Sequence, residues 1–333
     1  MSYIDLAIDL GTSFVSIYKK GSGLVLKEPA MVCVTTGAKA NTVKQIGLDA
    51  KKLQGKTGSG TVIVSPISEG IVKNVELAAS MLKHFLSKVK GSALKQKIKA
   101  VVTFPCGITA DELRDLERVV YSAGISEAFF VPSLVCAALG DKLRSIKSSV
   151  VVNIGGGKTE VGVLNGVTVI NGCSIGVGGK LMDLSVIDYV EENYNIVISD
   201  VMAEKVRKET GSLYETDKSS VEFSGTDISS NRVVSDIITA LDIKSAVKYF
   251  YDKIIEAVIV TINGCLPDIV TDITETGILV SGGAAEIAGL DNYFTKKLNL
   301  PVKIAEQFGN AVIIGAGALL NDEALLKQVL SEN

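Results

Sequence analysis

Residues 150–166 read VVVNIGGGKTEVGVLNG and place a glycine-rich turn between two apolar runs. Residues 150–152 precede the turn and residues 161–164 follow it, a pattern that predicts a β-hairpin with glycines at its tip. A glycine turn lets backbone N–H groups approach a phosphate because no Cβ stands in the way. The stretch therefore predicts a phosphate-binding hairpin.

Two further glycine turns occur in the chain. The first, Asp9-Leu10-Gly11-Thr12-Ser13, lies between apolar residues 4–8 and an alternating strand at 14–18, and the other is Ser281-Gly282-Gly283-Ala284-Ala285. No GxxxxGK followed by Ser or Thr is present, which excludes an ordinary P-loop. A hairpin repeated about 140 residues later predicts two similar lobes that face one polyphosphate, most simply a nucleotide.

The composition narrows the classes of function. With 333 residues the chain is long enough for two α/β lobes with separate cores. A net charge of −3 argues against nucleic acid as a principal partner. The five cysteines lie far apart without a CxxC pair, which is typical of reduced thiols in a cytoplasmic protein. We expect neither a signal peptide nor a membrane span, because no apolar run approaches ~18 residues.

Local signals predict the order of elements around the turns. Thr109 followed by Glu112 predicts a capping box at the start of a helix. The expected elements are strands over most of residues 3–36, a strand at 99–104, and helices at 75–89, 109–123 and 246–260.

The same signals predict a division into lobes. We expect residues 1–146 and 316–333 to form the first lobe and residues 147–315 the second, with an inserted subdomain at about 179–240. No linker rich in proline or serine separates them, which favours lobes that close on one cleft.

Five segments resemble the actin/Hsp70/sugar-kinase ATPases and, within them, the bacterial actin family MreB, in that family's order. They are AIDLGTSFVSIYKKGSGLVLKEPAMVCV, VVTFPCGITADELRDLERVVYSAG, VVNIGGGKTEVGVLNGV, MAEKVRKETGSLY and GILVSGGAAEIAGLDNYFTKKLNLPV. The resemblance implies an α/β, actin-like (ribonuclease H-like) duplicated fold with a nucleotide cleft between its lobes. It also implies head-to-tail cytoskeletal filaments that govern cell shape or motility, and it fits a divergent paralogue from a wall-less bacterium.

The resemblance also implies roles for individual residues. Gly11, Thr12 and Ser13 would bind the terminal phosphates of ATP or ADP, opposite Gly155, Gly156 and Gly157, and Asp9 would hold a water of bound Mg²⁺. Glu204, Arg207 and Lys208 share one helix face, which would contact ribose and adenine. Without the resemblance, that face would be a solvated charged surface. Gly282 and Gly283 would pass under the α-phosphate and base, with Ala284 in place of the family's usual third glycine.

The chain departs from the family pattern at the catalytic end. Where the family reads D-I-G-G-G-T-T-E, this chain has Asn153 and Lys158 in place of the aspartate and the first threonine. The glutamate that orients the attacking water in the family aligns with Ser133, or with Val131 in the alternative register. Neither register supplies a carboxylate, and no replacement carboxylate is apparent.

These departures predict an ATPase that is slow. Phosphoryl transfer depends on positioning and electrostatics, and losing a general base costs about 10²–10⁴-fold in rate. Lys158 would oppose this loss if it stabilised the transferred charge as an arginine finger does, whereas a Lys158 that points into solvent would have no effect. We expect the loss at Ser133 to dominate.

The remaining expectations concern partners. Lys88, Lys90, Lys95, Lys97 and Lys99 flank a short connection that would either contact an anionic membrane or form a solvated loop. The expected partners are other copies of this chain and other MreB paralogues. A small-molecule kinase of the same fold is the alternative function, although the chain lacks an identifiable substrate base and a Cys/His zinc cluster.

Overall fold

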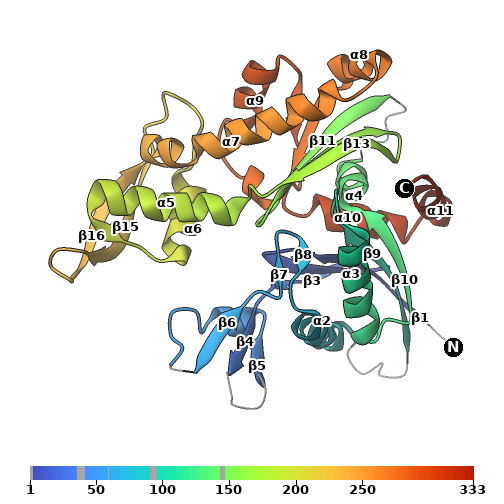
Figure 1. The fold of residues 1–333 in the computed structure, drawn as a ribbon, viewed down its shortest axis with the longest axis horizontal. Coiled ribbons are helices and arrows are strands. Elements are labelled where there is room, and N and C mark those ends of the chain that lie inside the picture. The colour runs from blue at the N-terminus through green and yellow to red at the C-terminus, as the bar shows by residue number, and fades with distance from the viewer. Residues whose placement is uncertain (1–2, 36–41, 59, 91–95, 143–146) are drawn as a thin grey trace.

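The computed structural model describes residues 3–35, 42–58, 60–90, 96–142 and 147–333, and Lys95 lies outside them. Figure 1 shows two lobes, each built on a mixed sheet. The order of the first sheet is β10 (Glu127–Pro132), β9 (Lys97–Phe104), β1 (Tyr3–Leu10), β2 (Phe14–Lys19) and β3 (Gly23–Pro29). The order of the second is β13 (Thr168–Ile175), β12 (Thr159–Asn165), β11 (Ser148–Ile154), β17 (Ile278–Ser281) and β18 (Val302–Ile304).

The two sheets have the same pairing pattern. β1 pairs antiparallel with β2 and parallel with β9, and β11 pairs antiparallel with β12 and parallel with β17. The strand pairs β1–β2 and β11–β12 each form a hairpin whose tip is a glycine turn. The structure therefore confirms the predicted duplicated α/β fold, although the exact lobe boundaries stay a prediction.

Smaller elements extend each lobe beyond its sheet. The first lobe adds β4 (Val32–Thr35), β5 (Thr42–Ile46), α1 (Leu48–Lys51), β6 (Thr61–Val64), β7 (Ile67–Ser68), β8 (Ile71–Val72), α2 (Val75–Lys90) and α3 (Ala110–Ser122). The second adds α5 (Gly179–Tyr194), β14 (Ile196–Val197), α6 (Asp200–Thr210), β15 (Ser220–Asp227), β16 (Val233–Thr239), α7 (Ala240–Asn263), α8 (Pro267–Thr276), η1 (Gly283–Ala285) and α9 (Leu290–Leu298).

The helices α4 (Ser133–Gly140) and α10 (Ala311–Leu319) pack against each other between the sheets, and α11 (Glu323–Glu332) follows them. Their shared core includes Ala7 of the first sheet and Val151 of the second. A Cβ at Gly315 would lie 1.8 Å from the carbonyl oxygen of Cys136, so this crossing requires glycine. The lobes are therefore joined by a continuous apolar layer.

Most predicted elements are present with shifted ends. The Thr109 capping box is confirmed, because its hydroxyl accepts from the backbone N–H of Glu112 and the Glu112 carboxylate accepts from that of Thr109. The predicted start of the helix at residue 246 is wrong, since α7 begins at Ala240 behind a second capping box between Thr239 and Asp242. In the part of the chain that the structure describes, no helix is long and apolar enough to cross a membrane.

Candidate functional site

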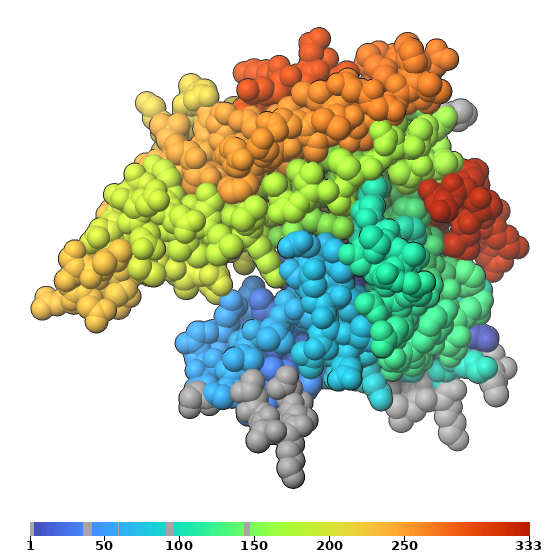
Figure 2. Space-filling model, viewed as in Figure 1, coloured from blue at the N-terminus to red at the C-terminus, as the bar shows by residue number. Residues whose placement is uncertain are grey.

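A cleft of about 790 Å³ lies between the lobes and is visible as a hollow in Figure 2. All three glycine turns contribute to its lining, so the duplicated sheets bring together segments far apart in the chain. The sequence-predicted residues that line it are Asp9, Gly11, Thr12, Ser13, Ser133, Asn153, Gly155, Gly156, Gly157, Lys158, Glu204, Arg207, Lys208, Gly282, Gly283 and Ala284.

The first two glycine turns have equivalent backbone geometry and approach each other closely. The N–H of Gly11 donates to the carbonyl of Phe14 at 3.0 Å, and that of Gly155 donates to the carbonyl of Lys158 at 2.9 Å. A Cβ at Gly156 would lie 1.9 Å from the Ser13 hydroxyl oxygen. Glycine is therefore required for the second turn to face the first.

The charged residues of the predicted adenosine helix α6 line the cleft and have different partners. Glu204 forms an ion pair with Lys208 at 3.0 Å. Arg207 is 3% exposed and its Nε pairs with Asp183 of α5 at 2.6 Å. Among the described residues, its Nη1 is buried without a hydrogen-bond partner. Arg207 therefore links α6 to α5 through Nε, and its Nη1 group takes no part in that pair.

The third turn combines an obligatory glycine with a packed alanine. Gly282 has φ 95°, and a Cβ there would lie 2.3 Å from the carbonyl oxygen of Ile154. Ala284 is buried, and its carbonyl accepts from the hydroxyl of Tyr251 at 3.0 Å. Ala284 therefore helps to anchor the turn to α7.

Glu160, which the sequence patterns did not single out, is buried in the lining of the cleft beside Ser133. Its Oε1 accepts from the Ser133 hydroxyl at 2.6 Å and from the N–H of Cys106 at 2.7 Å, and its Oε2 accepts from the side-chain amide of Asn153 at 3.0 Å. The expectation that no carboxylate stands near Ser133 is thus wrong. A single charged residue within the apolar strand β12 is the signal that could have revealed it.

Asp9 provides a carboxylate at the first glycine turn. The Thr103 hydroxyl donates to its Oδ1 at 2.7 Å. Burial raises the pKa of Asp9 to about 6, opposed by the Thr103 hydrogen bond and reinforced by the negative charge of Glu160. The described residues contain no cluster of three or more His, Cys, Asp or Glu that could hold a metal. A single half-buried carboxylate that lines the cleft still suits Mg²⁺, because the ion keeps most of its waters and takes few protein ligands.

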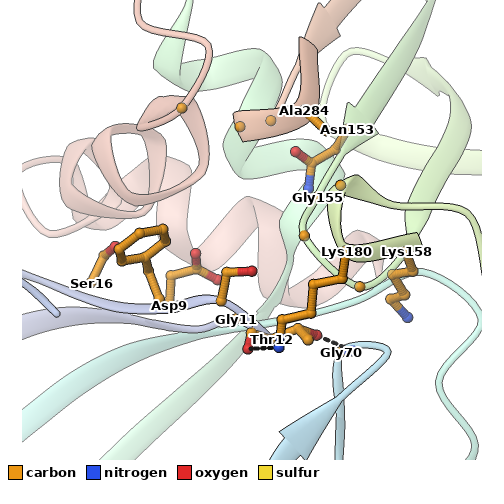
Figure 3. Close-up of a pocket in the computed structure, with 18 of the residues that line it drawn as sticks. Asp9, Gly11, Thr12, Ser16, Gly70, Asn153, Gly155, Lys158, Lys180 and Ala284 are labelled. Atoms are coloured by element: carbon orange, nitrogen blue, oxygen red, sulfur yellow. Dashed lines mark hydrogen bonds between the residues drawn. The ribbon is translucent and has the colours of Figure 1, made fainter. Parts of the chain in front are cut away.

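Two lysines of the second lobe lie at this end of the cleft (Figure 3). Lys158 runs beside Gly70 of the turn between β7 and β8, where a Cβ at Gly70 would lie 2.6 Å from the Lys158 Cε. Lys180, which the sequence analysis did not single out, instead reaches Thr12. Burial lowers the pKa of both lysines.

Most of the lysines predicted to flank a basic connection lie within regular elements. Lys88 and Lys90 belong to α2, and Lys97 and Lys99 belong to β9. Lys88 pairs with Glu28 at 2.6 Å, and Lys99 pairs with Glu127 at 3.7 Å. Part of the positive charge is therefore neutralised on the first lobe itself.

Comparison with known proteins gives consistent results. The family model described as MreB/Mbl protein matches residues 3–328. The cell shape-determining protein MreB of Escherichia coli is 32% identical over 322 residues, covering 95% of this chain and 93% of its own length. The cell shape-determining protein Mbl of Bacillus subtilis is 27% identical, with 98% and 99% covered.

Solved structures resemble the whole chain. MreB5 of Spiroplasma citri bound to ADP superposes with a TM-score of 0.90 at 29% identity, covering 98% of both chains. The same protein bound to AMPPNP gives 0.91 at 28% identity, with both chains covered completely. A MamK double helical filament gives a TM-score of 0.82 at 19% identity, covering 96% of this chain and 99% of MamK, which supports the actin-like fold.

Proposed function

The chain belongs to the MreB/Mbl family, and on that premise we propose that it is a nucleotide-binding bacterial actin that assembles head to tail into cytoskeletal filaments. Its filaments would contribute to cell shape or motility, since the E. coli and B. subtilis relatives are cell shape-determining proteins. The alternative of a small-molecule kinase has no support among these relatives.

The observation that carries the proposal is the meeting of three glycine turns in one cleft. The S. citri relative binds ADP and AMPPNP, and we assign ATP and ADP to this cleft. The N–H groups of the first two turns would hold the phosphates, while α6 would contact the adenosine through Glu204, Arg207 and Lys208.

Asp9 is the residue that fits a magnesium ion. Its carboxylate lines the cleft, and burial raises its pKa despite the hydrogen bond from Thr103 and the positive charge of Lys27. We propose that Asp9 holds a water of Mg²⁺, which would neutralise phosphate charge when the nucleotide is bound. Thr103 orients the carboxylate by donating to Oδ1.

We propose that this cleft hydrolyses ATP slowly. The Ser133 hydroxyl donates to Glu160, and the two Glu160 oxygens already accept three hydrogen bonds. The carboxylate hydrogen-bonded to Ser133 therefore has about one of its four acceptor positions left, and both of its oxygens are held in place by Cys106 and Asn153. Orienting a water requires an acceptor that is free to face the phosphate.

The filament would form through two different surfaces of each copy, because a head-to-tail contact is heterologous and need not close into a ring. We place the protein in the cytoplasm and include other MreB paralogues among its partners. A peripheral contact with anionic membrane through the lysines at the α2–β9 connection is also part of the proposal. The ion pairs of Lys88 and Lys99 limit its strength.

The test is nucleotide binding and pelleting of the full chain. The wild type should bind Mg-ADP or Mg-AMPPNP in calorimetry and pellet with Mg-ATP as filaments visible by electron microscopy. Gly156→Asp should abolish binding, because its Cβ would collide with Ser13 and its carboxylate would face phosphate. Gly176→Asp is the matched control, since a Cβ at Gly176 meets nothing within 4 Å. Wild-type binding no better than that of Gly156→Asp contradicts the assignment.

A further inference from the structure

Lys180 links the two phosphate turns across the cleft. Its backbone N–H donates to the carbonyl of Gly156 at 2.8 Å, which fixes the start of α5 against the second turn. Its Nζ lies 3.3 Å from the carbonyl oxygen of Thr12 in the first turn, 168 residues away in the chain (Figure 3). One side chain therefore spans from the second lobe to the first at the place where the two turns face each other.

The charge of Lys180 is poorly neutralised. None of the ion pairs found among the described residues involves Lys180, and its contact with Thr12 is to a neutral carbonyl. The carboxylates whose charge acts on it are Asp183, Asp200 and Glu204. Asp183 is already paired with Arg207, and Glu204 with Lys208. Lys180 is exposed to solvent within the cleft, and an ammonium group without an ion pair at this place favours an anionic ligand.

The other cleft lysines have different surroundings. Lys27 donates to Gly309 and Asn310, Lys51 and Lys208 pair with Glu204, and Lys158 lies beside Gly70. Of the lysines lining the described cleft, Lys180 is the one with a hydrogen bond to a glycine turn of the opposite lobe.

We propose that Lys180 is a specificity-determining residue that favours the nucleoside triphosphate over the diphosphate. Its side chain connects the two phosphate turns. The negative charge of the terminal phosphate would neutralise its ammonium group, so a triphosphate would bind more tightly than a diphosphate. This inference rests on the proposed nucleotide function and adds to it a residue that distinguishes the two ligands.

The experiment compares affinities for Mg-AMPPNP and Mg-ADP by calorimetry of the full chain. We expect wild type to prefer AMPPNP and Lys180→Met to reduce the ratio of the two affinities about tenfold, because one charge is removed near the additional phosphate charge. Lys180→Arg should keep most of the preference, since the positive charge is retained. Lys180→Gln keeps a hydrogen-bond donor without charge and should behave like Lys180→Met.

Lys208→Met is the control at the adenosine end of the cleft. It should weaken both ligands to a similar extent and leave the ratio unchanged. Melting temperatures without nucleotide show whether each variant is folded, and Lys180→Gln replaces Lys180→Met if the latter is unfolded.

The outcomes separate the two proposals. A wild type that binds neither nucleotide overturns the proposed function itself. A wild type that binds both, with an unchanged affinity ratio in Lys180→Met or Lys180→Gln, overturns the role of Lys180 alone. An equal loss of both affinities in those variants also overturns it, because the lysine would then not distinguish the third phosphate.

Discussion

Glu160 should contribute to the stability of the fold by connecting Cys106 and Ser133 to the second sheet, and its replacement tests this directly. Glu160 is 4% exposed. Its carboxylate accepts hydrogen bonds from Cys106, which follows strand β9 of the first sheet, from Ser133 at the start of α4, and from Asn153 of β11. Glu160→Ala leaves the partly buried N–H of Cys106 without its acceptor, whereas the side chains of Ser133 and Asn153 can turn toward other partners. An orphaned buried donor costs about 1–3 kcal/mol. A hydrogen bond to a charged group contributes about 1.5–3 kcal/mol.

We therefore expect Glu160→Ala to lose about 3 kcal/mol of stability. For a lobe of this size, that corresponds to a fall in melting temperature of about 6–12 °C. Glu160→Gln should lose less, about 1 kcal/mol, because its amide oxygen can still accept from Cys106 and Ser133. Its amide nitrogen would face the side-chain amide of Asn153, which must then turn over.

The assay is thermal unfolding of the nucleotide-free protein, followed by fluorescence or circular dichroism. Glu222→Ala is the matched control, since Glu222 is an exposed glutamate on strand β15 and its loss should change stability by less than about 0.5 kcal/mol. The reasoning is refuted if Glu160→Ala melts within 2 °C of wild type (about 0.5–1 kcal/mol). It is also refuted if Glu160→Gln is as destabilised as Glu160→Ala.

Three further predictions concern turnover, pH and membrane contact. The double variant Ser133→Glu with Lys158→Thr should release phosphate from Mg-ATP faster than wild type and by more than either single change, since residues that position one water act as a unit; a double variant no faster than wild type contradicts it. Burial would raise the pKa of Asp242, but its hydrogen bonds, first of all that from Thr239, outweigh burial and lower the pKa. Its stabilising effect is therefore present above the unfolded-state pKa of about 3.9 and lost as pH falls through the lower folded-state pKa. The difference in melting temperature between wild type and Asp242→Asn should shrink in acid, and a difference independent of pH argues against this. Co-sedimentation with anionic vesicles should exceed that with neutral vesicles and decrease with salt, because contacts of basic residues are screened; equal pelleting with both leaves only a solvated connection.

The hairpins and helix caps could be predicted from the sequence because their causes are local. The turn at Gly155 is closed by a hydrogen bond to Lys158, three residues away, and the Thr109 cap depends on Glu112. The start of α7 had a similar local signal in Thr239 and Asp242, with aspartate in the position usually held by glutamate, and was missed. The repeated hairpin also indicated duplication before the matching sheet orders were known.

The sequence by itself therefore determined the phosphate hairpins and the two-lobed fold, since both follow from short-range patterns repeated along the chain, and it missed Glu160 and Lys180 among the residues that line the cleft. Only the tertiary structure decided which charges meet there. Glu160 contacts Cys106, 54 residues away, and Lys180 contacts Thr12, 168 residues away. Such pairs depend on how α4 and α10 join the two sheets, and no local pattern encodes the distance between side chains on different lobes.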